Sequence, residues 1–138
     1  MKPIVECFFD NQTNTATYLV HGSDSGDAAI VDPVLGFDVR SGLLDTDSAD
    51  ALIEAVESRG LTLRYILETH AHADHLSAAP YIQDRLGGKI GIGEKITMIQ
   101  DTFGKVFNEG TEFQRDGSQF DALFKDGDTY QVGTMPVF

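Results

Sequence analysis

The order of apolar and polar positions predicts an α+β chain that starts with strands and then alternates strands with helices. Short apolar runs bounded by polar turn residues predict strands, and apolar residues recurring every three or four positions predict helices. The predicted strands cover residues 4–9, 17–20, 28–31, 63–67 and 89–92, and the predicted helices cover residues 48–59, 78–86 and 94–107. This order favours a sheet with helices over one of its faces.

The remaining segments are predicted from their turn residues. Residues 36–47 and 108–119 are predicted to be loops, and residues 123–124 and 129–132 to pair as a terminal hairpin around a turn at 125–128. Gly60 is suited to end the first helix, Pro80 fits the first turn of the second, and Gly87 follows the end of that helix. We see no repeat and no linker, so residues 1–138 are predicted to form one domain.

Charge and composition narrow the class of protein. The chain has 41% hydrophobic and 23% charged residues, typical of a globular protein, and its net charge is −12. This charge argues against binding to nucleic acid or to an anionic membrane surface. No apolar run approaches the ~20 residues that span a bilayer, and the first residues lack the layout of a signal peptide. We therefore expect a cytoplasmic protein. The single cysteine, Cys7, is expected to be a buried thiol.

The strongest chemical signal is the run from Glu68 to His75, which directly follows the predicted strand at 63–67. It holds three of the four histidines of the chain, and imidazole and carboxylate groups bind Zn, Fe and Mn. Because strand side chains alternate between two faces, His70 and His72 can point the same way. Asp74 and His75 follow as the chain turns toward a helix. The alternative is a polar loop whose histidines only cap backbone groups.

This run resembles a known family. The letters T-H-A-H-A-D-H at residues 69–75 are similar to the T-H-x-H-x-D-H signature of the metallo-β-lactamase superfamily. Neighbouring segments, including D-P-V at 32–34 and L-G-G-K-I-G-I-G at 86–93, resemble its glyoxalase II-like branch, above all bacterial persulfide dioxygenases and β-lactamase hydrolase-like proteins. The resemblance implies an αββα sandwich. Members of the family carry further metal ligands in a second half, and residues 76–138 contain no histidine, so we expect this chain to correspond to the N-terminal half.

The resemblance also implies roles for the candidate residues. His70, His72, Asp74 and His75 are the expected metal ligands, and Asp74 is the candidate catalytic group. In persulfide dioxygenases one Fe(II) is held by two histidines and one aspartate, and His70 is the one of those ligands found here; the other three residues would then orient ligands or move protons. Asp32 either holds a ligand as a supporting carboxylate or only starts the turn at Pro33. His21 is expected to be a surface histidine.

Two enzymatic functions and one non-enzymatic alternative remain open. The first is oxidation of glutathione persulfide to sulfite by Fe(II) and O2. The second is hydrolysis of a thioester or lactam by Zn-bound water, since Zn lowers the pKa of that water to about 7. The third is a catalytically incomplete fragment. A half sandwich would expose an apolar sheet face, so we also expect a homo-oligomer.

Overall fold

In the part of the chain that the structure describes, the main sheet has six strands in the order β1-β2-β3-β6-β8-β9. The computed structural model describes residues 3–10, 15–22, 26–38, 43–69, 76–93, 121–132 and 135–137. The strands are β1 (Pro3–Asp10), β2 (Thr15–Gly22), β3 (Asp27–Val31), β6 (Thr62–Leu67), β8 (Lys89–Gly93) and β9 (Ala122–Phe124). The pairs β1–β2 and β2–β3 are antiparallel, and β3, β6, β8 and β9 run parallel to their neighbours. The sheet is therefore mixed.

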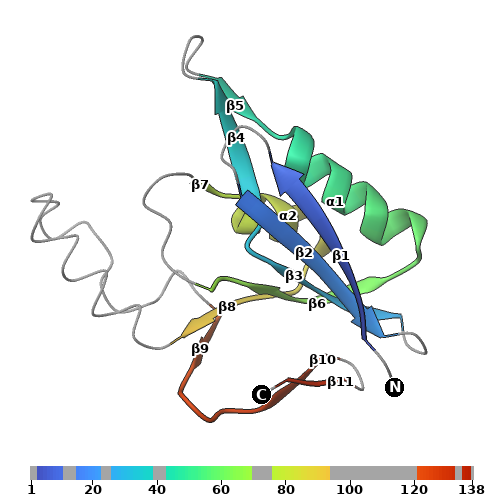
Figure 1. Ribbon diagram of the computed structural model, residues 1–138, viewed down its shortest axis with the longest axis vertical. Coiled ribbons are helices and arrows are strands. Elements are labelled where there is room, and N and C mark those ends of the chain that lie inside the picture. The colour runs from blue at the N-terminus through green and yellow to red at the C-terminus, as the bar shows by residue number, and fades with distance from the viewer. Residues whose placement is uncertain are drawn as a thin grey trace, which may run out of the picture.

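Two helices, α1 (Asp47–Ser58) and α2 (Ala79–Leu86), cover one face of this sheet (Figure 1). Their apolar stripes pack on side chains from alternate strand positions, which confirms a sheet with helices over one face. The largest fully buried members of this core are Leu19, Ile30, Leu52, Val56, Ile66 and Ile82. Near the outer side of the helices, Tyr81 of α2 donates a hydrogen bond of 2.7 Å to Asp50 of α1. This bond, ahead of a second one from Thr46, lowers the pKa of Asp50.

The helix ends follow the expected residues. Gly60 adopts φ +65° just after α1, a conformation that glycine reaches without strain, and Pro80 lies in the first turn of α2. The third predicted helix, at residues 94–107, and the loop at 108–119 lie outside the described residues. Within the described part of the chain, no helix has the length and apolar character that crossing a bilayer requires.

The loop predicted at residues 36–47 is wrong in part, because the structure forms a second, three-stranded sheet there. Its order is β5 (Leu43–Asp45), β4 (Val34–Asp38) and β7 (Leu76–Ser77), with β4 antiparallel to both neighbours. The strands are short, and β4 pairs with a segment about forty positions further along the chain. Local alternation of apolar residues, which predicts strands, carries no signal for such a pairing.

The terminal hairpin is also wrong in its pairing. The turn exists, since the backbone N–H of Asp128 donates to the carbonyl of Lys125 over 3.0 Å. However, β9 joins β8 in parallel, and β10 (Tyr130–Val132) pairs with β11 (Met135–Val137). Three-residue strands offer the same apolar pattern to either partner, so the pattern did not select one.

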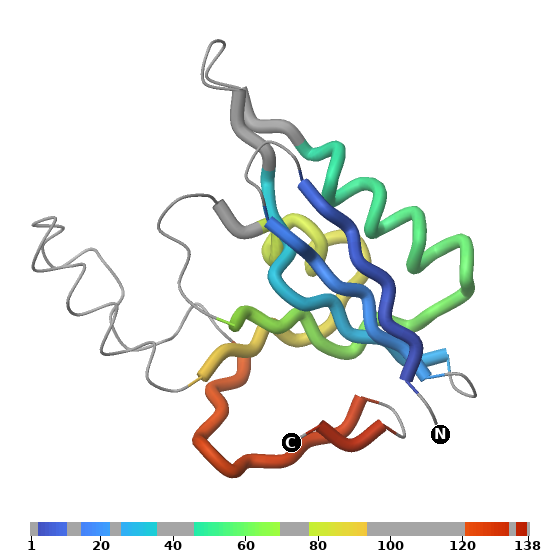
Figure 2. The backbone as a smooth tube through the Cα atoms, in the orientation of Figure 1, coloured from blue at the N-terminus to red at the C-terminus, as the bar shows by residue number. Residues whose placement is uncertain are grey.

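The β10–β11 hairpin lies across the sheet face opposite the helices, as Figures 1 and 2 show. Val132 and Met135 are buried there against Ala29 of β3, with Tyr65 and Leu67 of β6 packed around them. The face is thus partly covered by the end of the chain itself. Tyr130 also stacks on Phe124, with ring centroids 4.4 Å apart.

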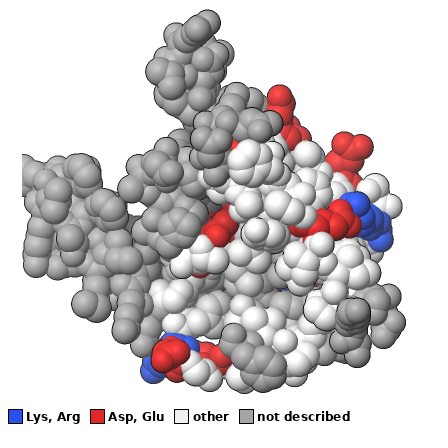
Figure 3. Space-filling view, in the orientation of Figure 1, with Lys and Arg blue, Asp and Glu red and all other residues white. Residues whose placement is uncertain are grey.

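The part of this face on β1 and β2 remains uncovered in the described structure. We call it the open face; it consists of Val5, Cys7, Phe9 and Tyr18, which are all exposed. Cys7 is therefore not the buried thiol that we expected, because it sits on the side of β1 that points away from the helices. Figure 3 shows few charged side chains over the middle of the molecule where β1 and β2 lie, with acidic side chains flanking it along α1.

Candidate metal centre

The histidine-rich segment follows β6, and β6 runs parallel to β3 in the middle of the sheet. The carboxyl ends of parallel neighbours meet at one edge of a sheet, where loops carry ligands in many folds. Asp32, the residue after β3, therefore lies beside the end of β6, and its backbone N–H donates to the carbonyl of Leu67 over 2.8 Å. The sheet brings Asp32 to the start of the candidate metal segment, although 35 positions of sequence separate Asp32 from Leu67.

The carboxylate of Asp32 holds Thr69, the residue directly before His70. Its Oδ1 accepts a hydrogen bond from the backbone N–H of Thr69 at 2.8 Å, and its Oδ2 accepts one from Thr69 Oγ1 at 2.5 Å. Asp32 is 9% exposed. Hydrogen bonds to a charged acceptor that is shielded from water are among the stronger ones in proteins. The two bonds from Thr69 to Asp32 therefore fix the point where the histidine-rich segment begins.

Asp32 is itself held in an uncommon backbone conformation. Its φ is +54°, the left-handed region that aspartate tolerates better than most residues with a side chain. Thr17 of β2 donates its hydroxyl to the Asp32 carbonyl at 2.7 Å. Of the two roles left open for Asp32, starting a turn and supporting the metal segment, the contacts with Thr69 favour the second.

The far end of the segment is anchored to the same stretch of chain. Leu76 and Ser77 form β7 and pair with Leu35 and Val34 of β4, and the N–H of Ala78 donates to the carbonyl of Pro33 over 3.0 Å. Both flanks of residues 70–75 are therefore tied to residues 32–35.

A further contact fixes the flank on the β6 side. The N–H of Glu68 donates to the carbonyl of Gly91 in β8 over 2.9 Å, and Glu68 is buried with 7% exposure. Glu68 contributes to the sheet through its backbone N–H, whereas the Thr69 hydroxyl has a specific partner, Asp32, that the sequence did not reveal. The only sign of this contact in the sequence is that a residue with a hydroxyl group directly precedes the first histidine of the run.

The four candidate ligands, His70, His72, Asp74 and His75, lie outside the described residues. Their convergence on one pocket stays a prediction. Within the described residues no group of three or more His, Cys, Asp or Glu side chains could hold a metal ion. Three imidazoles and one carboxylate are a donor set that fits Fe(II) or Zn.

The fourth histidine, His21, is not the surface residue that we expected. Its side chain is 12% exposed, and its Nε2 is buried with no hydrogen-bond partner among the described residues. Its Nδ1 lies 3.2 Å from the carbonyl of Gly22, and its Nε2 lies 3.9 Å from Glu6 Oε1. Glu6 also receives a bond from Arg59, just after α1, so the end of that helix covers this part of β2. The imidazole is therefore a packing residue of the helix side of the sheet.

Comparison with known proteins agrees with this arrangement. The family model described as the metallo-beta-lactamase superfamily matches residues 10–134. The chain is 53% identical over 133 residues to a probable metallo-hydrolase of Burkholderia pseudomallei, covering 96% of the chain and 45% of the relative. It is 28% identical over 125 residues to the mitochondrial persulfide dioxygenase ETHE1 of Bos taurus, covering 91% of the chain and 37% of that protein.

The fold comparison extends this likeness to solved structures. The crystal structure of ETHE1 from Myxococcus xanthus superimposes with a TM-score of 0.67 at 23% identity, covering 96% of the chain and 45% of that structure. At this low identity, the superposition shows a shared fold and nothing about function. The chain spans less than half the length of each of these three proteins.

Proposed function

Because the chain belongs to the metallo-β-lactamase superfamily, we propose that His70, His72, Asp74 and His75 hold the metal of a metal-dependent enzyme. The observation that carries this proposal is the double anchoring of residues 70–75. Asp32 holds Thr69 on one side, and β4 pairs with Leu76 and Ser77 on the other. Ligand residues bind a metal more tightly when neighbouring groups hold them in place beforehand.

The reaction that we propose first is oxidation of glutathione persulfide. The overall change is persulfide plus O2 plus water giving the thiol and sulfite, so the outer sulfur loses four electrons and O2 accepts them. Bound Fe(II) would supply open coordination positions and electron transfer. The similarity to a persulfide dioxygenase supports this choice, and the small-molecule persulfide is the partner that we propose.

The second reaction is hydrolysis of a glutathione thioester or a lactam with bound Zn. Zn would supply a water whose pKa is lowered to about 7. The relative with 53% identity carries the name of a probable metallo-hydrolase, which favours this alternative. Asp74 is the candidate group of this chain to orient that water or to take up its proton.

The chain's own described residues have a positioning role in either reaction. Asp32 is buried and its carboxylate is committed to Thr69, so it would hold the start of the ligand segment and not touch the substrate. We also propose that the protein is a homo-oligomer, since the open face exposes apolar side chains. A chain that binds metal and catalyses neither reaction would correspond to the third possibility, a catalytically incomplete fragment.

One experiment separates these possibilities. The chain is loaded anaerobically with Fe(II) or separately with Zn, and each form is given glutathione persulfide with O2, or a glutathione thioester. Oxygen uptake with sulfite release by the Fe(II) form supports the first reaction, and thioester cleavage by the Zn form supports the second.

A pair of histidine variants controls for metal bound elsewhere. His70→Ala should lose the bound metal, because His70 is a ligand in both proposals. His21→Gln is the matched control, since His21 is remote in the sheet and should leave the metal content unchanged. Equal metal loss in both variants would refute the ligand assignment.

A further inference from the structure

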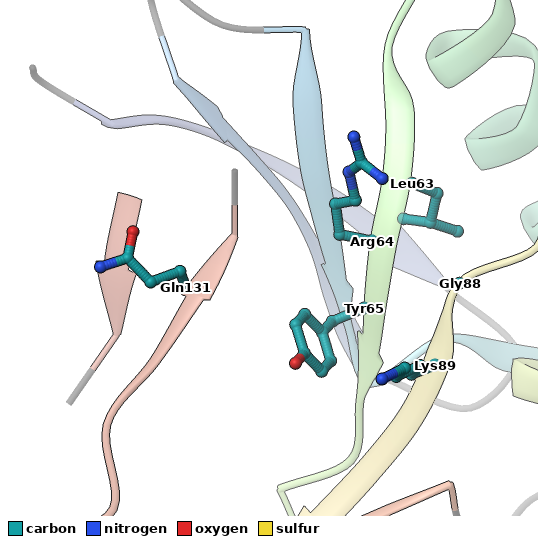
Figure 4. A pocket seen from close by; sticks show the side chains of 6 residues that line it. All are labelled: Leu63, Arg64, Tyr65, Gly88, Lys89 and Gln131. Carbon is teal, nitrogen blue, oxygen red and sulfur yellow. The ribbon is translucent and has the colours of Figure 1, made fainter. Parts of the chain in front are cut away.

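A pocket of about 430 Å³ opens between the sheet and the β10–β11 hairpin, beside the first residues of β6. It is lined by Leu63, Arg64, Tyr65, Gly88, Lys89 and Gln131 (Figure 4). The proposed metal segment follows the other end of β6. From Leu63 to Leu67 the strand spans ~13 Å at ~3.3 Å per residue. The pocket is therefore separate from the candidate metal centre.

The pocket is basic in a strongly acidic protein. The chain carries 10 basic residues against 22 acidic ones, and only five of the basic residues lie in the described part. Two of those five, Arg64 and Lys89, line this pocket from neighbouring strands. In Figure 4 their side chains and that of Tyr65 lie on the side of β6 and β8 that faces the hairpin, whereas Leu63 points to the opposite side.

The described residues compensate the positive charge of the pocket only in part. Arg64 donates from Nε to Oδ1 of Asp27 in β3 at 2.5 Å. This bond orients the guanidinium group and uses one of its donors, while the two terminal nitrogens form no ion pair with the residues that the structure describes. Lys89 is exposed and forms no ion pair within the described part of the chain. One ammonium group and one oriented guanidinium group therefore share the pocket, and among the described residues Asp27 is the one carboxylate that pairs with them.

The other walls are closely packed. Gly88 has φ +92°, where a side chain would be strained, and a Cβ on it would lie 3.2 Å from the Leu63 carbonyl, so the chain passes close to β6 here. Tyr65 forms the apolar wall. Its ring is held by Tyr130, at 5.1 Å between centroids, and by Phe124, at 6.2 Å.

We propose that this pocket binds a small organic anion, with its phosphate or carboxylate group between Arg64 and Lys89 and its apolar part against Tyr65. Arginine and lysine donate charge-assisted hydrogen bonds to such oxyanions. Two cationic side chains beside one aromatic ring match an anion that also carries an apolar part, and the volume lies within the range of small-molecule sites. The two basic residues are not needed for solubility, because the surplus of acidic residues already favours it.

The test is a titration of the metal-free chain followed by NMR of its backbone amides. The probes are phenyl phosphate and benzoate, which differ in the oxyanion, benzyl alcohol, which lacks the charge, and inorganic phosphate, which lacks the ring. Shifts should appear at Arg64, Tyr65 and Gly88 with either aromatic anion. Stronger binding of one anion identifies the phosphate or the carboxylate as the preferred group.

Two lysine variants decide whether the pocket is responsible. Lys89→Gln should weaken binding about tenfold, the effect of losing one charge-assisted contact. Lys125→Gln removes the same charge from an exposed turn outside the pocket and should change nothing. The binding should also be the same in His70→Ala, so its outcome is independent of the metal assignment.

Several results would overturn the proposal. One is equal weakening by both lysine variants, which would indicate attraction of anions to the surface in general. A second is binding of benzyl alcohol or inorganic phosphate as tight as that of phenyl phosphate. A third is the absence of shifts at the three amides up to about 10 mM probe, a concentration at which even a site with a Kd of about 6 mM is more than half filled.

Discussion

The hydrogen bonds between Asp32 and Thr69 are the part of the candidate metal centre that mutation can test most directly. The informative change is Asp32→Asn. Asparagine has nearly the same size and also tolerates the left-handed conformation at φ +54°, so backbone strain does not confuse the result. The asparagine oxygen can still accept from the Thr69 N–H. At the position of Oδ2, which now accepts from the Thr69 hydroxyl, asparagine has an amide donor, and the side chain no longer carries a charge.

The size of the effect follows from burial and charge. A hydrogen bond to a charged group contributes about 1.5–3 kcal/mol, and one between neutral groups about 1 kcal/mol. Asp32 is 9% exposed, so solvent replaces little of what is lost. We therefore expect Asp32→Asn to lower the free energy of unfolding by about 1–3 kcal/mol. Thr69→Val removes only the hydroxyl and should cost about 1 kcal/mol, while Thr69→Ser keeps both donors and should be close to the parent.

Two measurements are needed, because stability alone would also respond to a purely structural role. Urea unfolding gives the free energy, and titration with Zn gives the metal affinity. If Asp32 positions the ligand segment, metal affinity should fall about tenfold or more in Asp32→Asn, as it does for groups that orient metal ligands. Asp128→Asn is the control, since its carboxylate accepts from the backbone N–H of Lys125 in an exposed turn at 2.7 Å.

Two results would refute this reasoning about Asp32. Loss of stability in Asp32→Asn with unchanged metal affinity would show that Asp32 serves the sheet edge and not the metal segment. Unchanged stability together with unchanged affinity would show that the two hydrogen bonds contribute nothing measurable.

Three further predictions concern other parts of the sheet. In Gly91→Ala the new Cβ would lie 2.5 Å from a ring carbon of Phe124, so the ring must move and thermal unfolding should show a loss of about 1–3 kcal/mol; an unchanged midpoint would contradict the close approach. The chain should self-associate at micromolar concentration, and Phe9→Ser, at a site 57% exposed on the open face, should weaken association about tenfold; a 15.0 kDa parent monomer in sedimentation equilibrium would contradict this. Because Tyr81 lowers the pKa of Asp50 below 3.8, their bond should stabilise the fold above that pH and stop doing so as the pH falls through the lowered value. The difference in urea midpoint between the parent and Tyr81→Phe should therefore be larger at pH 6 than at pH 2.5, and a difference that grows toward low pH would contradict the sign.

The sequence predicted the elements whose signal is local. The helix from Asp47 to Ser58 and the strand from Thr62 to Leu67 lie within one residue of the predicted bounds, because each has its own apolar period and its own turn residues. The errors concern pairing. Whether β9 joins β8 or β10, and whether β4 finds β7, depends on contacts between distant segments, which the pattern of a single segment does not contain.

A second kind of error concerned which side of a strand is covered by helices and which is exposed. Cys7 and His21 sit on neighbouring strands, and each was assigned the wrong environment. Alternation shows that two faces exist, but α1 and α2 decide which one is covered. Cys7 points to the open face, and His21 lies beneath the end of α1. The sequence places an apolar residue on a strand and does not say on which side the helices will pack.

For the candidate metal centre, the division between local and distant information is the same. The spacing of His70, His72 and His75 is local, and it is the basis for predicting a metal site from the sequence. The support for that segment is distant: Asp32 belongs to the turn after β3, and Thr69 meets it only because β3 and β6 run parallel, side by side. Asp32 can therefore be recognised as a supporting residue only once the strand order is known.

The anchors of the histidine segment also explain why the sheet and the proposed metal site belong together. Each described anchor is a backbone hydrogen bond or the bond between Asp32 and Thr69, and none uses a proposed metal ligand. The fold therefore holds both ends of residues 70–75 without help from a metal. In small zinc domains the metal itself drives folding, since no other core exists. Here the buried core beneath α1 and α2 supplies stability, so the proposed ligands need not also hold the fold together.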